Sequence, residues 1–177
     1  MSETPFDRDA ALRDYVARQG ITDALHRYLR GLDRLDPALT RSAFTADAFV
    51  DCGLMAGPAD AFVAFALDLL GAMEASHHLM GQARIELHGE ATASGEVYFQ
   101  AWQATRNEAG EPRDLFIAGR YVDEYACDNG EWRIRRRHLI TDWTRDEPAD
   151  RSFLESPTTN RGARRGEDFS ERRTWPA

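Results

Sequence analysis

The sequence predicts an α+β fold in which helices from the first part of the chain pack against a curved antiparallel sheet formed by the second part. Up to about residue 73, apolar residues recur mainly at helical spacing. From Ser76 onward, apolar and polar residues alternate in long segments joined by short turns, which is typical of neighbouring antiparallel strands. A curved sheet with helices across its concave face makes a cone with an apolar pocket, a common kind of small-molecule site.

The first 34 residues predict two helical segments. Residues 1–8 are expected to be loose, and a helix is expected from Ala10 to Arg18. Gly20 is expected to kink or break this helix before it continues to about Arg34. The apolar face of the first segment is made of Leu12, Tyr15 and Val16, and that of the second of Ile21, Leu25, Tyr28, Leu29 and Leu32.

Two aspartates near the end of this region have different expected roles. Asp36 precedes Pro37, which is typical of a helix N-cap followed by proline at the first helical position, so a short helix is expected over 37–44. Asp33 has no such local role and lies at the edge of the apolar stripe. Because an unpaired buried charge is costly, Asp33 needs a partner, and His78 is the best candidate.

The remaining elements follow from period, length and turn residues. A short strand is expected over 46–52, a turn at Gly57-Pro58, and a strongly apolar helix over 59–73 that packs across the sheet. Asn129-Gly130 predicts a tight hairpin turn, because Asn and Gly accept positive φ angles. The long strands are expected over 79–87, 96–105, 115–125 and 132–143.

Composition divides the chain into one folded domain and a polar tail. The predicted domain covers residues 9–146, which is enough for one sizeable core. Residues 147–177 are rich in charged and turn-forming residues and poor in apolar ones. For this segment we expect either a disordered tail or an arm that orders against a partner subunit.

Charge and hydropathy exclude several functional classes. The net charge of -8 argues against nucleic acid as the main partner. No apolar run is long enough to cross a bilayer, so no membrane partner is expected. Residues 1–5 lack the basic and apolar regions of a signal peptide, and a cytoplasmic location is therefore expected.

The cysteines and basic residues limit the chemistry. Cys52 and Cys127 form neither a CxxC motif nor a metal-ligand spacing, so they are expected to be reduced thiols, and no metal is expected. All 22 basic residues are arginine, which leaves no lysine for a Schiff-base or lysine-base mechanism.

Several short motifs occur in a recognisable order. A tyrosine lies five residues before the helix-end aspartate, and His78 begins the next long strand. Gly-Arg-Tyr-x-Asp-x-Tyr follows over 119–125, then Asn-Gly-x-Trp-Arg-Ile over 129–134 and an arginine. Together, over residues 10–145, they resemble the SnoaL-like branch of the nuclear transport factor 2-like superfamily, in particular the group containing γ-hexachlorocyclohexane dehydrochlorinase and bile-acid dehydratase. The resemblance implies a cone-shaped α+β barrel.

The resemblance also implies site residues. The aspartate of the family falls on Asp33, its histidine on His78 rather than His77, and its arginine on Arg137. Tyr28 matches a tyrosine of bile-acid dehydratase, where the dehydrochlorinase has lysine. The positions that match pocket walls are Val50, Val97, Phe99, Ile117, Gly119 and Tyr121.

These residues suggest acid–base chemistry. A neutral histidine is a good general base near pH 7, and a carboxylate on its other nitrogen fixes the tautomer and stabilises the imidazolium. Tyr28 and Arg137 would donate hydrogen bonds to a developing oxyanion or a departing hydroxyl group. The expected function is a cofactor-independent lyase or dehydratase that removes a proton and a leaving group from a hydrophobic ring-containing small molecule.

Other functions remain open. The same pocket could serve an isomerase, a carbon–carbon lyase or a polyketide aldol cyclase, and a non-catalytic binding or assembly subunit is a further alternative. The resemblance implies a homodimer or homotrimer that forms through the outer face of the sheet.

The single residues also have structural interpretations. His78 could be a structural histidine, and Tyr28 could be an ordinary core residue. Arg136 rather than Arg137 could point inward if a bulge shifts the strand register. Asp123 is expected to have a structural role.

Overall fold

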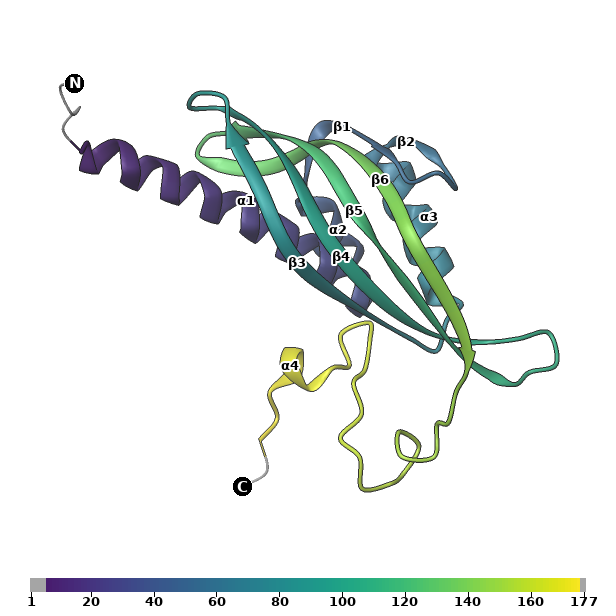
Figure 1. Cartoon of the computed structure of the whole chain (residues 1–177). Helices are drawn as coiled ribbons and strands as arrows, with labels where there is room; N and C mark the ends of the chain where they lie inside the picture. The colour runs from purple at the N-terminus through teal and green to yellow at the C-terminus, as the bar shows by residue number, and fades with distance from the viewer. Residues whose placement is uncertain (1–5, 176–177) are drawn as a thin grey trace.

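A computed structural model describes residues 6–175 of the chain (Figure 1). Over this range the chain forms four helices and six strands. The helices are α1 (Arg8–Arg34), α2 (Pro37–Ser42), α3 (Ala59–Gly71) and α4 (Phe169–Arg172). The strands are β1 (Phe44–Asp51), β2 (Ala56–Pro58), β3 (Ala75–Leu87), β4 (Thr92–Arg106), β5 (Pro112–Asp128) and β6 (Glu131–Pro148).

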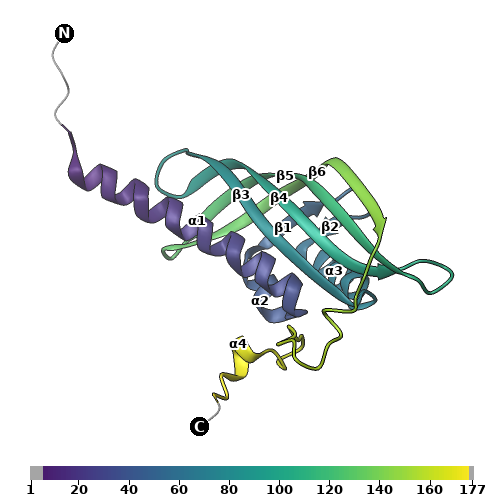
Figure 2. The ribbon, with the colours of Figure 1, turned by 60° about the horizontal axis from the view of Figure 1, so that its bottom comes forward.

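The six strands form one curved, unclosed sheet with the order β2-β1-β6-β5-β4-β3. The pairing of β1 with β6 is parallel, and the other pairings are antiparallel. Figure 2 shows the sheet arching over α1, α2 and α3. The predicted fold class, helices followed by a curved sheet that encloses them, is confirmed. β1 is the exception to the predicted antiparallel sheet, because it follows α2 along the chain and pairs in parallel with β6.

The first helix is continuous, so the predicted break at Gly20 is wrong. α1 runs from Arg8 to Arg34, and Asp7 caps its N-terminus by accepting hydrogen bonds from two backbone N–H groups. Gly20 faces Trp132, and a Cβ atom at position 20 would lie 2.8 Å from Cδ1 of that ring. Glycine is therefore needed here for close packing and does not end the helix.

The N-terminal half of α1 extends beyond the sheet (Figure 1). Its predicted apolar face, Leu12, Tyr15 and Val16, is exposed, whereas Ile21 and Leu25 further along the helix are fully buried. Residue 8 already belongs to α1, and residues 1–5 of the segment that was predicted to be loose lie outside the described residues.

Two of the predicted local features are confirmed and one is corrected. Asp36 caps α2 through a hydrogen bond of 2.9 Å from the N–H of Leu39. Asn129 and Gly130 have φ angles of 52° and 81° and form the hairpin turn between β5 and β6. Gly57-Pro58 does not turn the chain but belongs to β2; the turn lies just before it, at Gly53, whose φ is +78°.

The polar C-terminal segment folds back on the domain it belongs to. Figures 1 and 2 show it returning from the end of β6 toward the C-terminal end of α1, where the N–H of Arg165 donates to the carbonyl oxygen of Arg34 at 2.8 Å. Arg151 is buried and pairs with Asp114, while Arg164 donates to the carbonyl oxygens of Leu70 and Met73 at 3.0 and 3.1 Å. Docking of the segment on its own chain was not one of the two alternatives expected from the sequence. The residues that anchor it are polar, so no apolar face indicated this docking.

Among the described residues, no helix has both the length and the apolar character needed to cross a membrane.

Candidate functional site

An apolar cavity of about 430 Å³ lies between the helices and the inner face of the sheet. Exposed residues at its rim, Leu54 and Leu69, mark its mouth, and buried aromatic rings form its deeper part. Its lining comprises Tyr28 and Leu32 from α1; Cys52, Gly53 and Leu54 from the β1–β2 loop; Phe62, Phe65, Ala66, Leu69 and Leu70 from α3; and His78, Phe99, Ala101, Gln103, Ile117, Tyr121, Leu139 and Thr141 from the sheet.

His78 lines this cavity, and Asp33, which is not part of the lining, holds its ring. Asp33 lies in the last turn of α1, and His78 lies near the start of β3. The Nδ1 atom of His78 is 2.6 Å from Oδ1 of Asp33, and the backbone N–H of His78 donates to Oδ2 at 2.9 Å. The side chain of His78 is only 7% exposed and that of Asp33 only 12%. The predicted contact is present, and it leaves Nε2 as the histidine nitrogen available to a bound molecule.

Strand alternation explains why His78 rather than its neighbour makes this contact. Successive side chains in a strand point to opposite faces. His77 is exposed, whereas His78 faces the helices and pairs across the sheet with Ala101 of β4, another cavity residue.

Two tyrosines form the deep end of the cavity. The rings of Tyr28 and Tyr121 meet edge-on with centroids 5.6 Å apart, and Phe99 stacks on Tyr121 at 4.4 Å. Burial raises the pKa of Tyr28, although the charge of Arg137 partly opposes this shift. Burial also raises the pKa of Tyr121 well above its ordinary value. Both phenols are therefore protonated at neutral pH and can donate hydrogen bonds.

Arg137 points inward as predicted, but its expected role as a donor in the pocket is corrected. Its Nε and Nη2 atoms donate to the two carboxylate oxygens of Asp123 at 2.8 and 2.6 Å, and neither side chain is exposed. Tyr125 also donates to Asp123, at 2.9 Å. Arg137 is absent from the cavity lining because it lies behind the tyrosines, 4.3 Å from the Tyr28 centroid and 3.9 Å from that of Tyr121.

The buried ion pair keeps Arg137 charged. Burial alone would lower the pKa of Arg137, but the charge of Asp123 and its hydrogen bonds outweigh burial, so the net shift is upward. Arg136 points to the outer face, where it pairs with Glu124. The arrangement supports the tyrosine rings from behind and gives Asp123 the structural role expected for it.

Three of the six predicted wall positions line the cavity: Phe99, Ile117 and Tyr121. Val50 and Val97 do not, because they are fully buried in the core. Gly119 contributes no wall either. A Cβ atom there would lie 2.1 Å from the carbonyl oxygen of Ile140 and 3.0 Å from the Phe99 ring, so glycine permits the close strand approach that places Phe99.

The sequence contained signals for several lining residues that were not assigned to the pocket, three on α3 and one on β4. The α3 residues Phe62, Phe65 and Leu69 were expected only to pack across the sheet, yet a helix that covers a concave sheet also covers its pocket. Gln103 shares the inward alternation of Phe99 and Ala101, which could have identified it as a cavity residue.

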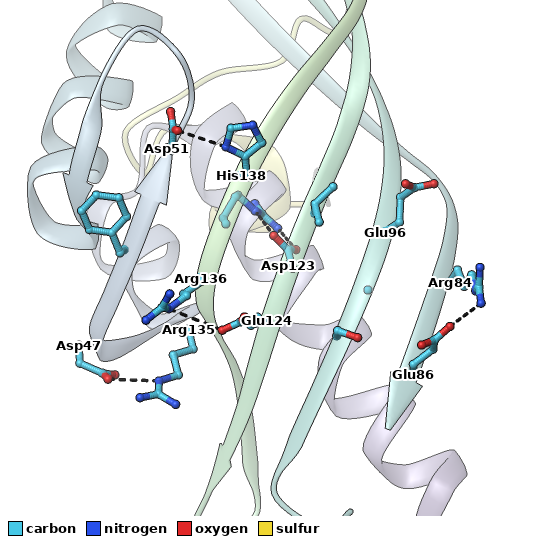
Figure 3. A pocket seen from close by; sticks show the side chains of 15 residues that line it. Asp47, Asp51, Arg84, Glu86, Glu96, Asp123, Glu124, Arg135, Arg136 and His138 are labelled. Carbon is cyan, nitrogen blue, oxygen red and sulfur yellow. Dashed lines mark hydrogen bonds and ion pairs between the residues drawn. The ribbon is translucent and has the colours of Figure 1, made fainter. Parts of the chain in front are cut away.

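A larger hollow of about 850 Å³ lies on the opposite face of the sheet. Figure 3 shows its charged side chains, with Arg135 paired to Asp47, Arg136 to Glu124, and His138 to Asp51. The two arginines and their carboxylates neutralise one another on an exposed surface. We therefore place the candidate site in the inner cavity, where His78, held by Asp33, faces an apolar space.

Within residues 6–175, no group of three or more His, Cys, Asp or Glu side chains is arranged to hold a metal ion.

The SnoaL-like domain family model matches residues 13–138 of the chain. No curated protein matches the chain by sequence. The match begins within α1 and ends in the first half of β6; it includes Asp33, His78 and both tyrosines and stops before the C-terminal segment.

Solved structures share the fold at low sequence identity. A scytalone dehydratase-like protein from Novosphingobium aromaticivorans has a TM-score of 0.69 and 21% identity, over 79% of this chain and 93% of that one. A hexachlorocyclohexane dehydrochlorinase from Novosphingobium barchaimii has a TM-score of 0.69 and 16% identity, over 77% and 94%.

A beta subunit of the aromatic-ring-hydroxylating dioxygenase type, also from Novosphingobium aromaticivorans, has a TM-score of 0.58 and 26% identity, over 75% of this chain and 93% of that one. The family match covers more than two thirds of the sequence, and it agrees with the resemblance found in the motifs. The chain belongs to the SnoaL-like domain family.

Proposed function

We propose that this protein is a lyase that eliminates water or another leaving group from a hydrophobic ring compound, with the Asp33–His78 pair as its base. The single observation that carries the proposal is the 2.6 Å contact between Nδ1 of His78 and the Asp33 carboxylate at the wall of an apolar cavity. A histidine whose one nitrogen is held by a carboxylate and whose other nitrogen faces a binding space has the arrangement of a general base.

The first half of the proposed reaction is proton removal. Nε2 of His78 accepts a proton from a substrate carbon, and the negative charge of Asp33 stabilises the imidazolium that forms. Because Asp33 also holds the backbone N–H of His78, the carboxylate fixes the strand as well as the ring. Acid–base assistance of this kind contributes on the order of 100- to 10,000-fold to a rate.

The second half is departure of the leaving group. Tyr28 and Tyr121 line the same cavity, and their raised pKa values keep them as donors. A phenol O–H directed at a departing oxygen would stabilise the charge that develops on it. Arg137 supports this step indirectly, through its position behind both rings.

The cavity favours a hydrophobic substrate. Its volume of about 430 Å³ falls in the range of small-molecule pockets, and most of its lining is aliphatic or aromatic. The dehydratase-like and dehydrochlorinase structures with this fold are named for the loss of water and of hydrogen chloride. That naming supports elimination as the reaction class for this chain.

The test is elimination from a panel of cyclic compounds that carry a hydroxyl group or halide one carbon away from an acidic C–H bond. Alkene formation is followed by ultraviolet absorbance, and loss of water or acid by mass spectrometry. We expect the wild-type protein to convert at least one member, and His78→Gln to lower kcat roughly 100-fold or more.

His77→Gln is the matched control, because it removes the same side chain from the adjacent, exposed position. It is expected to keep the wild-type rate. Two results would contradict the proposal: no elimination by the wild-type protein from any panel member, or equal rates for wild-type and His78→Gln.

A further inference from the structure

The strand that carries His78 lies at an edge of the sheet. β3 is the last strand in the sheet order, and within residues 6–175 it pairs with β4 alone. The backbone N–H of His78 donates to the side chain of Asp33, so a helix holds this part of the strand. Strand ends at a sheet edge open more readily than central strands, because fewer hydrogen bonds hold them. The contact between the two residues therefore depends on what else joins β3 to α1.

One residue of the C-terminal segment binds the start of β3. The Nη1 atom of Arg164 donates to the carbonyl oxygens of Leu70 and Met73, which lie at the end of α3 and in the connection to β3. Its Nη2 atom donates to the hydroxyl oxygen of Ser76 at 3.1 Å. Ser76 is buried and lies two residues before His78 on the same strand. Arg164 thus holds the backbone on the side from which the chain enters β3.

The next residue of the segment binds the end of α1. The backbone N–H of Arg165 donates to the carbonyl oxygen of Arg34, one residue after Asp33, at 2.8 Å. The buried carboxylate of Asp168 lies 3.8 Å from Nε of Arg34 and accepts a hydrogen bond from the N–H of Ala163. Consecutive residues of the segment therefore grip the two elements that carry the proposed base, below the end of α1 in Figure 2.

The segment acts from outside the cavity. Arg164 and Asp33 line a separate hollow of about 400 Å³ between the segment and the domain. Burial lowers the pKa of Arg164, and the negative charge of Asp33 partly opposes this shift. None of the described residues of the segment lines the inner cavity, and the family match ends before the segment begins. Contacts of the segment therefore influence the site through Asp33 and His78 rather than through a bound molecule.

We propose that Arg164 is a positioning residue that holds the start of β3 against the end of α1 and so keeps His78 within hydrogen-bond reach of Asp33. The proposal rests on the proposed function and adds to it a role for the C-terminal segment. A base that is displaced from its productive geometry loses rate, because proton transfer requires the two atoms within hydrogen-bond reach. Loss of Arg164 should therefore lower kcat and leave the cavity, and hence KM, as it is.

The test compares two glutamine variants of the segment. Arg164→Gln removes the guanidinium that binds the start of β3. Arg161→Gln is the matched control, because Arg161 is exposed, lines the same hollow and forms no hydrogen bond or ion pair with another described residue. Both variants remove one positive charge from the hollow, and only Arg164→Gln also removes contacts with β3.

Amide hydrogen exchange measures the positioning without any substrate. The His78 amide is bound by Asp33, so its exchange rate reports how often this contact opens. We expect Arg164→Gln to raise this rate roughly tenfold and Arg161→Gln to leave it unchanged. Amides in the middle of β5 are the internal reference, because a general loss of stability would raise their exchange rates as well.

Steady-state kinetics on the ring substrate that the wild-type protein converts separate positioning from a purely structural role. Circular dichroism first establishes that each variant is folded under the assay conditions. Arg164→Gln should then lower kcat roughly tenfold and keep KM within about twofold of the wild-type value. A residue that only stabilises the fold would leave both constants of the folded protein unchanged, as we expect for Arg161→Gln.

Asp168→Asn provides a second route to the same result, because it loosens the segment without removing a bond to β3. The exchange rates of the Arg165 and His78 amides should rise by similar factors in this variant. The proposal is overturned if only the Arg165 amide exchanges faster in Asp168→Asn. It is also overturned if Arg164→Gln keeps the wild-type exchange rate at His78 or the wild-type kcat.

The two readouts separate this proposal from the proposed function. Exchange at His78 that responds to Arg164, together with elimination that does not require His78, would overturn the lyase proposal and leave Arg164 as the residue that holds the Asp33–His78 contact. Elimination that requires His78, together with a His78 amide and a kcat that do not respond to Arg164→Gln, would overturn only the role of Arg164.

Discussion

The carboxylate of Asp33 binds His78 twice, through Nδ1 of the ring at 2.6 Å and through the backbone N–H at 2.9 Å. The two bonds join the C-terminal turn of α1 to the edge strand β3 and hold the imidazole in one orientation. A general base must be positioned before its protonation state matters. Here a single aspartate both positions the strand and supports the ring.

The buried pair behind the tyrosines predicts a large stability effect. Arg137→Met leaves Asp123 as an uncompensated buried charge, and we expect it to lower the free energy of unfolding by roughly 3–5 kcal/mol. Urea denaturation measures the change. Arg136→Met, one residue away in an exposed ion pair with Glu124, should cost about 1 kcal/mol or less. Equal losses for the two variants would contradict the burial of the Arg137–Asp123 pair.

The buried tyrosines predict loss of stability at alkaline pH. Burial raises the pKa of Tyr28, Tyr121 and Tyr125 in the folded protein. Above about pH 10 an unfolded tyrosine releases its proton while the folded one keeps it, so stability is complete below pH 10 and falls as pH rises. The chain has no lysine, which removes the other abundant group that titrates in this range.

Two phenylalanine variants test this slope. Tyr121→Phe should make the fall in unfolding free energy between pH 10 and 11 shallower by about 1 kcal/mol per pH unit. Tyr15→Phe, at an exposed position on α1, should leave the slope as it is in wild type. Denaturant titrations at several alkaline pH values distinguish the two, and identical slopes for both variants would rule out the contribution of Tyr121.

Asp168 predicts an acid-sensitive attachment of the C-terminal segment. Hydrogen bonds from Ser170, first from its hydroxyl and also from its N–H, and from the N–H of Ala163 hold the pKa of Asp168 below its ordinary value. The stabilisation is complete above the unfolded-state pKa of about 3.9 and is lost as pH falls toward the lower folded-state value.

Asp168→Asn should therefore loosen the segment at pH 7 by roughly 1–3 kcal/mol. Hydrogen exchange of residues 163–172 reports the change as faster exchange in the variant, and acidification below about pH 4 should bring the wild-type segment toward the same state. Glu167→Gln, at a neighbouring exposed carboxylate, should keep wild-type protection. Unchanged protection in Asp168→Asn would show that the segment is held by other contacts.

Periodicity was sufficient to predict the fold, because both the helical stripe and the strand alternation record which side of an element is buried. The low helix propensity of glycine wrongly predicted an interruption at Gly20. The close approach of Trp132 requires a glycine at this position, and the helix continues through it. Composition failed for the C-terminal segment, since Arg151 and Arg164 anchor it through ion pairs and carbonyl oxygens rather than through an apolar face.

The candidate site was predictable where the signal is local. Asp33 stood out because a helix-edge carboxylate needs a partner, and the family resemblance pointed to Arg137, with Arg136 as the alternative. Whether Arg137 reaches the pocket depends on the residue that it faces on β5, which is Asp123. The register of β5 against β6 shifts close by, between Glu124 and Tyr125. A strand pairing with such irregularities is a property of the folded sheet, so the Asp123 contact could not be predicted from spacing along the chain.

The most direct test of the Asp33–His78 base is a double-mutant cycle on elimination from the ring substrate that the wild-type protein converts, with kcat/KM measured for Asp33→Asn, His78→Gln and the double variant. If Asp33 acts only through His78, the double variant is no slower than His78→Gln alone, and Asp33→Asn alone loses a large part of the wild-type rate. Losses that multiply in the double variant, or an Asp33→Asn protein with the full wild-type rate, would contradict the account.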